Sequence, residues 1–129
     1  YRISLGMDYN FNKKTYGFFE YHFNSAGSGQ PEDYLKALNS SAFSEGFVYL
    51  MGKHYLNVGT TYQVTPLVPF TGLLIFNIND GSFTFSPKLE YNIAENIYIS
   101  VGAYIGIGNF KSEFGAYPDI FFTSFRIYF

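Results

Sequence analysis

The chain contains no cysteine and no tryptophan, and only 14% of its 129 residues are charged. Without cysteine it has neither a disulfide framework nor a thiolate metal site. The formal net charge is −2 and no run of Lys or Arg is present. Binding to nucleic acid calls for a basic patch or stripe. We therefore expect no nucleic acid among its partners.

Long apolar runs are also missing, because no stretch approaches the roughly 18 consecutive apolar residues that a membrane-spanning helix needs. Aromatic residues nevertheless make up 22% of the chain, and an ordinary soluble domain has about a quarter of its residues charged. This balance indicates that something other than water faces part of the surface. For a membrane protein without helical spans, only a closed β-sheet satisfies every backbone polar group.

What the sequence does contain is alternation of apolar and polar residues with the period of two that a β-strand requires. In 1–11, every odd residue is Tyr, Ile, Leu, Met or Phe, and every even residue is Arg, Ser, Gly, Asp or Asn. One segment, 67–79, is apolar on both sides, so alternation does not decide its facing. We predict an all-β domain spanning 1–129, an antiparallel up-and-down sheet with strands at 1–11, 15–23, 54–64, 67–79, 82–93, 97–108 and 120–129.

The alternation stops between residues 24 and 53. The stretch opens with a flexible Asn-, Ser- and Gly-rich run, and Pro31 followed by two acidic residues is typical of a helix start. We therefore predict a long loop at 24–53 that contains a short helix at 31–38. The segment 43–51 is compatible with a second helical turn or with a strand.

All charged residues of the predicted strands fall on the polar face, which is otherwise made of small, hydroxylic or amide side chains and Tyr. A soluble lipocalin-like barrel also alternates, but its outer face is usually dense in Lys and Glu. Sparse and balanced charge instead favours the lumen of a transmembrane barrel whose apolar face contacts lipid. The predicted lumen-lining residues are Arg2, Asp8, Glu20, His22, Lys88, Glu90 and Arg126.

Two groups on this face have possible chemistry. Glu20 and His22 share a strand face roughly 7 Å apart, either to pass a proton or bind a ligand, or as part of a hydrogen-bonded network. The three basic and three acidic strand residues form either a charged constriction that selects solutes or ion pairs that fill a narrow barrel. No catalytic residue, metal site or cofactor is predicted, and the chain is not expected to be an enzyme.

The last predicted strand ends in a regular apolar pattern, with Phe121, Phe125, Ile127 and Phe129 on one face and an aromatic residue at the terminus. This ending resembles the C-terminal strand of Gram-negative outer-membrane β-barrel proteins, and it departs from the usual form at Phe122 and Ser124. The resemblance implies the C-terminal portion of a porin-like barrel, surrounded by the lipid of the bacterial outer membrane. It also implies that the barrel assembly machinery recognises Phe125, Ile127 and Phe129.

In this family the last strand ends at the periplasmic rim, periplasmic turns are short and extracellular loops are long. The resemblance therefore makes 24–53 a long extracellular loop and 109–119 another. A strand at 43–51 would move the Gly- and Ser-rich stretch to the periplasmic side, so we predict that 43–51 belongs to the loop.

Seven strands place the first and last strands in the same direction, whereas bacterial single-chain barrels have even strand numbers from eight upwards. We predict that these residues do not close a barrel alone and that upstream strands or other subunits complete it. The favoured function is a passive channel or porin-like transporter for small solutes. The alternative is a closed barrel that serves as a membrane anchor, an adhesin or a lipid-modifying enzyme.

Overall fold

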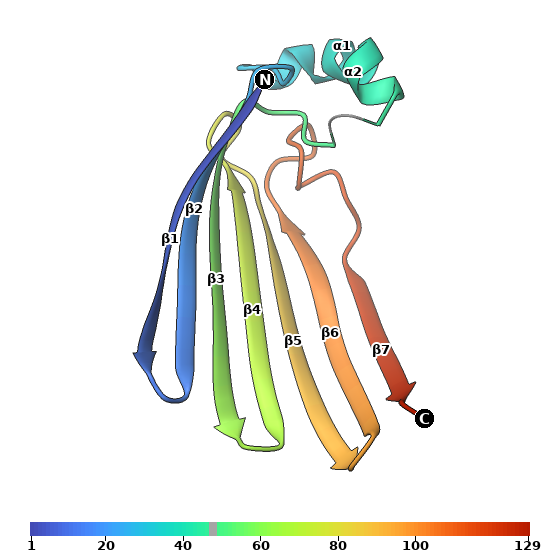
Figure 1. Ribbon diagram of the computed structural model, residues 1–129. Coiled ribbons are helices and arrows are strands. Elements are labelled where there is room, and N and C mark those ends of the chain that lie inside the picture. Colours follow the sequence, from blue (N-terminus) through green and yellow to red (C-terminus); the bar gives the residue numbers. More distant parts are fainter. Residues whose placement is uncertain (47–48) are drawn as a thin grey trace.

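The computed structural model describes residues 1–46 and 49–129. Seven antiparallel strands form one sheet in chain order, each paired with the next (Figure 1). The all-β prediction and the number of strands are confirmed. The strands are β1 (Arg2–Asn12), β2 (Thr15–Asn24), β3 (His54–Thr65), β4 (Val68–Asn77), β5 (Phe83–Ala94), β6 (Ile97–Ile107) and β7 (Ile120–Ile127).

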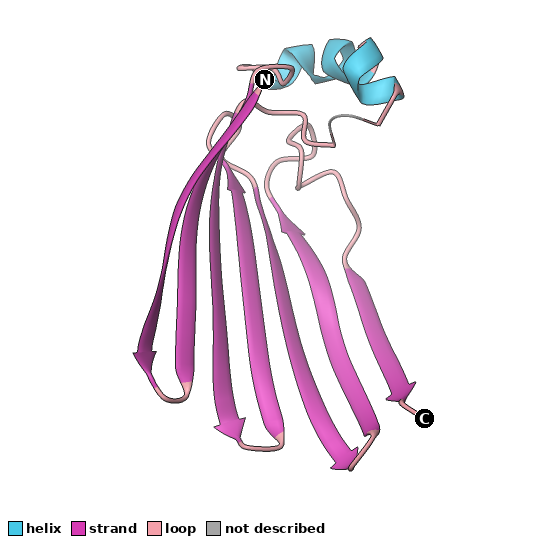
Figure 2. Cartoon of the chain, in the orientation of Figure 1, coloured by secondary structure: helices cyan, strands magenta, loops and turns pink. Residues whose placement is uncertain are grey.

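The two ends of the sheet differ in how the strands are connected. Two-residue turns join β1 to β2, β3 to β4 and β5 to β6 at one end, called here the short-turn end. The segments 25–53, 78–82 and 108–119 connect the strands at the other end, called the loop end. All the helices lie at the loop end: η1 (Pro31–Asp33), α1 (Tyr34–Leu38) and α2 (Ser41–Ser44) (Figure 2).

The helical segments follow from local sequence. Pro31 occupies the first turn of η1, with Glu32 and Asp33 beside it, so the short helix predicted at 31–38 is confirmed. The backbone N–H of Phe43 donates to the Ser40 side chain, which caps α2. The predicted loop segment 43–51 forms no strand in its described part, and residues 47–48 lie outside the described residues. No helix of the described residues has the length and apolar character of a membrane span.

The register keeps apolar residues on one face across the sheet, because directly paired residues share a face. One row of successive partners on this apolar face is Met7, Phe19, Val58, Leu74, Phe85 and Ile105. The adjacent row on the opposite, polar face is Gly6, Glu20, Asn57, Ile75, Thr84 and Gly106. The facing of β4 is thereby settled: Leu74 lies on the apolar face, and Leu73 and Ile75 lie on the polar face.

Glycines on the polar face make room for large neighbours. A Cβ added to Gly59 would lie 2.1 Å from the Phe18 ring, and one added to Gly102 would lie 2.5 Å from the Phe122 ring. The two rings therefore lie over glycine backbone on adjacent strands. Gly102 of β6 thus accommodates the Phe122 ring of β7.

The sheet is not closed. Strands β1 and β7 are its two edges, and no ladder joins them among the described residues. Both strands run from the loop end to the short-turn end. Neighbouring strands alternate in direction, so the first and the last of seven antiparallel strands run the same way. The prediction that these residues alone do not form a closed barrel is confirmed.

Candidate functional site

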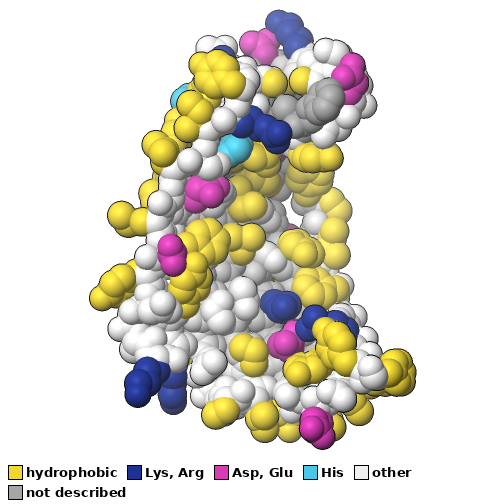
Figure 3. All heavy atoms as spheres, in the orientation of Figure 1, with side chains coloured by type: hydrophobic (Ala, Val, Ile, Leu, Met, Phe, Trp, Pro, Cys, Tyr) yellow, Lys and Arg dark blue, Asp and Glu magenta, His cyan; other side chains and the backbone are white. Residues whose placement is uncertain are grey.

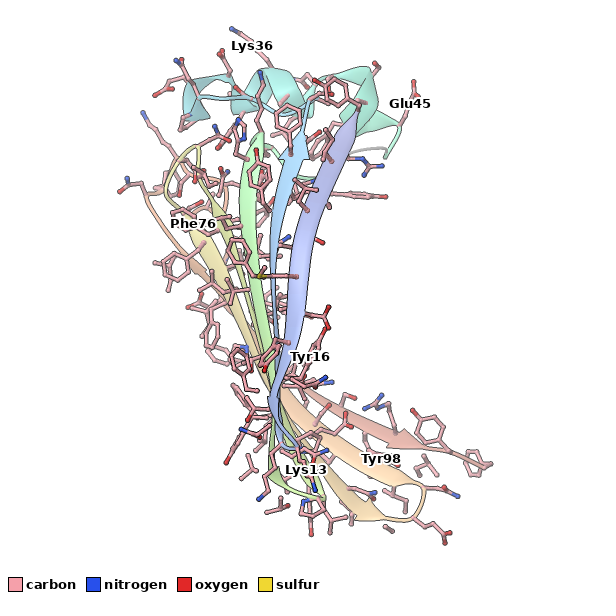
Figure 4. The ribbon with its side chains drawn as sticks, turned by 60° about the vertical axis from the view of Figure 1, so that its left-hand side comes forward. Lys13, Tyr16, Lys36, Glu45, Phe76 and Tyr98 are labelled. Atoms are coloured by element: carbon pink, nitrogen blue, oxygen red, sulfur yellow. The ribbon has the colours of Figure 1, made fainter. Side chains whose placement is uncertain are left out.

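The polar face is the candidate functional surface. The register places all seven predicted lumen-lining residues on it, and within the seven described strands no Asp, Glu, Lys or Arg lies on the apolar face. Figure 3 looks onto the polar face, where charged side chains lie in a hollow between the two edges of the sheet. In Figure 4, Phe76 and Tyr16 lie on opposite sides of the strands.

Glu20 and His22 share this face but do not contact each other. The Asn57 side-chain amide donates to Glu20 Oε1 at 3.0 Å. The Nδ1 atom of His22 is hydrogen bonded to the Ser4 hydroxyl at 2.8 Å. Glu20 is therefore hydrogen bonded to β3 and His22 to β1, as in a hydrogen-bonded network. No hydrogen bond joins the two side chains to each other.

The strand charges gather at one position. On the polar face near the short-turn end, Glu90 accepts a hydrogen bond from Arg126, and Lys88 Nζ lies 3.6 Å from the same Glu90 oxygen. Arg2 and Asp8 form no ion pair with any described residue. Three of the six strand charges therefore lie in one cluster, and the other three lie apart from it.

A second cluster, at the loop end, was not predicted from the sequence. It consists of Tyr34, Tyr55, Asn77, Asp80 and Glu113, hereafter the loop-end cluster. Tyr55 and Asn77 are paired residues on the polar face of β3 and β4, and both are fully buried. Tyr34 comes from α1, Asp80 from the β4–β5 turn and Glu113 from the β6–β7 loop. Five elements therefore meet over the loop end of the polar face.

The Glu113 carboxylate organises this cluster. It accepts from the Tyr55 hydroxyl at 2.5 Å, from Asn77 Nδ2 at 2.7 Å and from the backbone N–H of Met51 at 2.8 Å. Glu113 is only 3% exposed. Burial raises the pKa of the Glu113 carboxyl above its ordinary value, and the three donors only partly offset that effect.

Asp80 binds the remaining segments to this cluster. Its Oδ2 accepts from the Tyr34 hydroxyl at 3.0 Å and from the backbone N–H of Glu113 at 2.7 Å. Its Oδ1 accepts from both the backbone N–H and the hydroxyl of Ser82. Burial, followed by the charge of Asp80, raises the pKa of Tyr34, so its hydroxyl remains a neutral donor.

The β6–β7 loop folds over the polar face. The Phe114 ring packs edge-on against Tyr55 with 6.4 Å between centroids. The Phe114 carbonyl oxygen lies 2.2 Å from the position a Cβ would take on Gly106, a residue of the polar face. The loop can lie this close because Gly106 has no side chain. The β6–β7 loop therefore folds inward over the polar face.

Sequence reasoning missed the loop-end cluster because its members lie outside any periodic pattern. Glu113 is 58 residues from Tyr55 and 36 residues from Asn77, and a single acidic residue in a loop carries no spacing signal. No group of His, Cys, Asp or Glu suited to a metal ion is found among the described residues. The carboxylate oxygens of Glu113 and Asp80 accept hydrogen bonds from protein donors, as expected of a cluster that holds the loops in place.

Compared with known proteins, the chain matches no family model, no curated protein and no solved structure.

Proposed function

We propose that this chain is part of the wall of an outer-membrane β-barrel, with its apolar face on lipid and its polar face lining a passive channel for small solutes. One observation carries the proposal: the division of the sheet into an apolar face without Asp, Glu, Lys or Arg and a polar face with all the strand charges. The strands are 8 to 12 residues long, and a strand that crosses a bilayer needs about 9 to 11.

The exposure of the apolar face supports a lipid environment. Met7 is 74% exposed, Leu5 66%, Phe125 60% and Val101 48%. Soluble monomers rarely expose continuous apolar patches of more than a few hundred Å². Here the exposed apolar face continues across seven strands, and hydrocarbon would cover it without loss of backbone hydrogen bonds.

The open edges define what must complete the barrel. Because β1 and β7 run in the same direction, an odd number of further antiparallel strands joins them without a parallel seam. One such strand gives the smallest even number, eight, found in bacterial barrels. Unpaired edge groups in hydrocarbon cost several kcal/mol each, so the additional strands are part of the proposed protein or its assembly.

The charged, hydroxylic and amide side chains of the polar face support a channel. The β6–β7 loop and α1 cover the loop end and narrow that entrance, since Tyr34 and Glu113 are both buried there. A closed barrel that acts as an anchor, an adhesin or a lipid-modifying enzyme is the competing function. Ion conduction distinguishes the channel from the closed barrel.

The experiment is single-channel recording in planar bilayers with the complete protein purified from membranes. We expect discrete conductance steps in KCl. A protein that inserts into vesicles but conducts no ions would contradict the channel and leave the closed barrel.

The membrane assignment has its own test, Val101→Arg, near the middle of β6 on the apolar face. An arginine on the lipid side near the bilayer midplane costs about 2 to 4 kcal/mol. Tyr104→Arg is the matched control, because Tyr104 is on the same strand, faces the other side and is half-exposed. Chemical unfolding in lipid vesicles measures both, and an equal loss for the two variants would contradict the lipid-facing assignment.

A further inference from the structure

Two cations on the polar face share one carboxylate. Arg126 and Lys88 both approach the same Glu90 oxygen. The Glu90 side chain is 18% exposed, whereas those of Lys88 and Arg126 are 40% and 45% exposed. The acid therefore lies beneath the two cations, and the group presents a net charge of +1 to the hollow of the polar face.

Beside this cluster is an open hollow of about 470 Å³, lined by Glu90, Asn96, Tyr98, Arg126 and Tyr128. The Tyr98 and Tyr128 rings pack edge-to-face with 5.8 Å between centroids. The Arg126 guanidinium carbon lies 5.9 Å from the centre of the Tyr98 ring. The backbone N–H of Tyr128 donates to the Asn96 carbonyl, which ties the end of the chain to the β5–β6 turn. Figure 4 shows Tyr98 near the short-turn end.

Most donors of the two cations are unused. A guanidinium has five N–H donors, and among the described residues Arg126 donates to Glu90 alone. The Lys88 ammonium donates to no described residue at hydrogen-bond distance. The Tyr98 ring and Glu90 restrict the orientation of the guanidinium, so little rotamer freedom remains to be lost when it binds a ligand.

The other acidic residues of the polar-face strands lie elsewhere. Asp8 is on β1 and Glu20 on β2, at the opposite side of the sheet. Glu95, in the β5–β6 turn, is exposed and does not line the hollow. The charged side chains that line the hollow are therefore Glu90 and Arg126, and Lys88 lies beside Glu90 outside the lining.

We propose that this hollow binds a small oxyanion, a phosphate or carboxylate group, through Arg126, that Lys88, which lies beside Glu90 outside the lining, adds positive charge, and that the site makes the channel prefer anions. The binding part stands on the cluster alone, and the preference rests on the proposed channel. Guanidinium groups bind both oxyanions through paired N–H donors, and the neighbouring Asn96 side chain adds a polar contact at the rim.

Binding is tested by equilibrium dialysis of labelled inorganic phosphate against the complete protein in detergent at low ionic strength. We expect saturable binding that weakens about tenfold or more in R126Q, the loss expected for a charge-assisted hydrogen bond. K88Q should weaken it less, and E90Q should strengthen it because the competing carboxylate is removed. Lys13→Gln, a charge change at the same end but outside the hollow, is the control. Absence of saturable binding, or equal binding by R126Q, would overturn the proposal.

Ion preference is tested by the reversal potential across a planar bilayer with a KCl gradient. We expect the wild-type channel to favour chloride, R126Q to lose that preference and E90Q to increase it, with Glu95→Gln as the control. A cation-selective wild type, or selectivity unaffected by R126Q, would overturn the preference. Phosphate binding without any conductance would instead contradict the channel and leave the oxyanion site standing.

Discussion

Glu113 is the residue that holds the loop end together, since its carboxylate accepts from the long β2–β3 loop, from β3 and from β4. A buried acceptor shared by three donors is costly to remove, because each donor then loses its partner without regaining water. Its titratable neighbours are Asp80, Tyr34 and Tyr55. The position of the β6–β7 loop therefore depends on the hydrogen bonds of one side chain.

The docking of this loop should weaken as pH rises. The pKa of Glu113 is raised from 4.5 by burial, so the docked loop favours the protonated form. The stabilisation from proton uptake is complete below the ordinary pKa and is lost as pH rises through the raised one. We expect protease cleavage within 108–119 to increase with pH in the wild-type protein.

Glu113→Gln is the control for this pH effect, because it has no carboxyl group to titrate. The two proteins are compared with the same protease at each pH, so that the pH dependence of the protease cancels. A wild type and a variant with the same pH dependence of cleavage would contradict the role assigned to Glu113.

Gly102 tests the packing of the polar face at a single residue. In Gly102→Ala the new Cβ would meet the Phe122 ring at 2.5 Å and the Pro87 carbonyl oxygen at 2.8 Å. Overpacking of this kind costs about 1 to 3 kcal/mol. Gly29→Ala is the matched control, since nothing lies within 4 Å of its added Cβ. The free energy of unfolding of both variants checks this, and an equal effect would show that the Phe122 ring moves away freely.

At the scale of elements, β7 combines an edge position with the pattern that resembles an assembly signal. Its ladder with β6 ends at the pair Ile97–Ile127, and Phe129 is fully exposed. A residue without packing contributes little to stability. Any effect of its removal is therefore separable from folding.

Deletion of Phe129 should reduce insertion in cells while the free energy of unfolding after refolding in detergent changes little. The reason is that the resemblance assigns Phe129 to recognition by the assembly machinery. Phe110→Ala, which alters another highly exposed aromatic residue, is the control and should insert normally. Normal insertion of the truncated protein would remove Phe129 from the assembly signal.

At the scale of the whole molecule, the open sheet predicts that β1 and β7 are not neighbours in the complete protein. These 129 residues contain no cysteine. A disulfide between two cysteines introduced into β1 and β7 would therefore report how close the two strands lie, with no native cysteine of these strands to compete. A disulfide needs Cα atoms about 4.4 to 6.8 Å apart, and one intervening strand separates its two neighbours by about 9.5 Å.

The pair Met7→Cys and Thr123→Cys, on β1 and β7, should therefore not form an intramolecular disulfide in the membrane. The pair Ala103→Cys and Phe121→Cys is the positive control, because these residues are direct partners across β6 and β7. Cross-linking is followed by gel mobility. Efficient cross-linking of the first pair would show that these seven strands close on themselves.

The alternation of side chains determined the seven strands, and the faces of all of them except β4, from the sequence alone, because a period of two assigns each residue to a face before any partner is known. The short helix at 31–38 followed from Pro31 and its acidic neighbours in the same local way. The predicted polar-face residues needed only this parity. Their lumenal position remains a proposal, since it depends on a barrel that these strands do not complete.

Only the tertiary structure decided which polar residues meet. Lys88, Glu90 and Arg126 come together because the register brings β5, β6 and β7 side by side, whereas Glu20 and His22 bind different strands. Glu113 reaches Tyr55 and Asn77 through a loop whose path no periodic pattern specifies. Contacts between residues distant in the chain, like the facing of the doubly apolar β4, depend on register and loop closure, which are properties of the folded sheet. In the other strands the facing follows from the alternation of each strand's own residues.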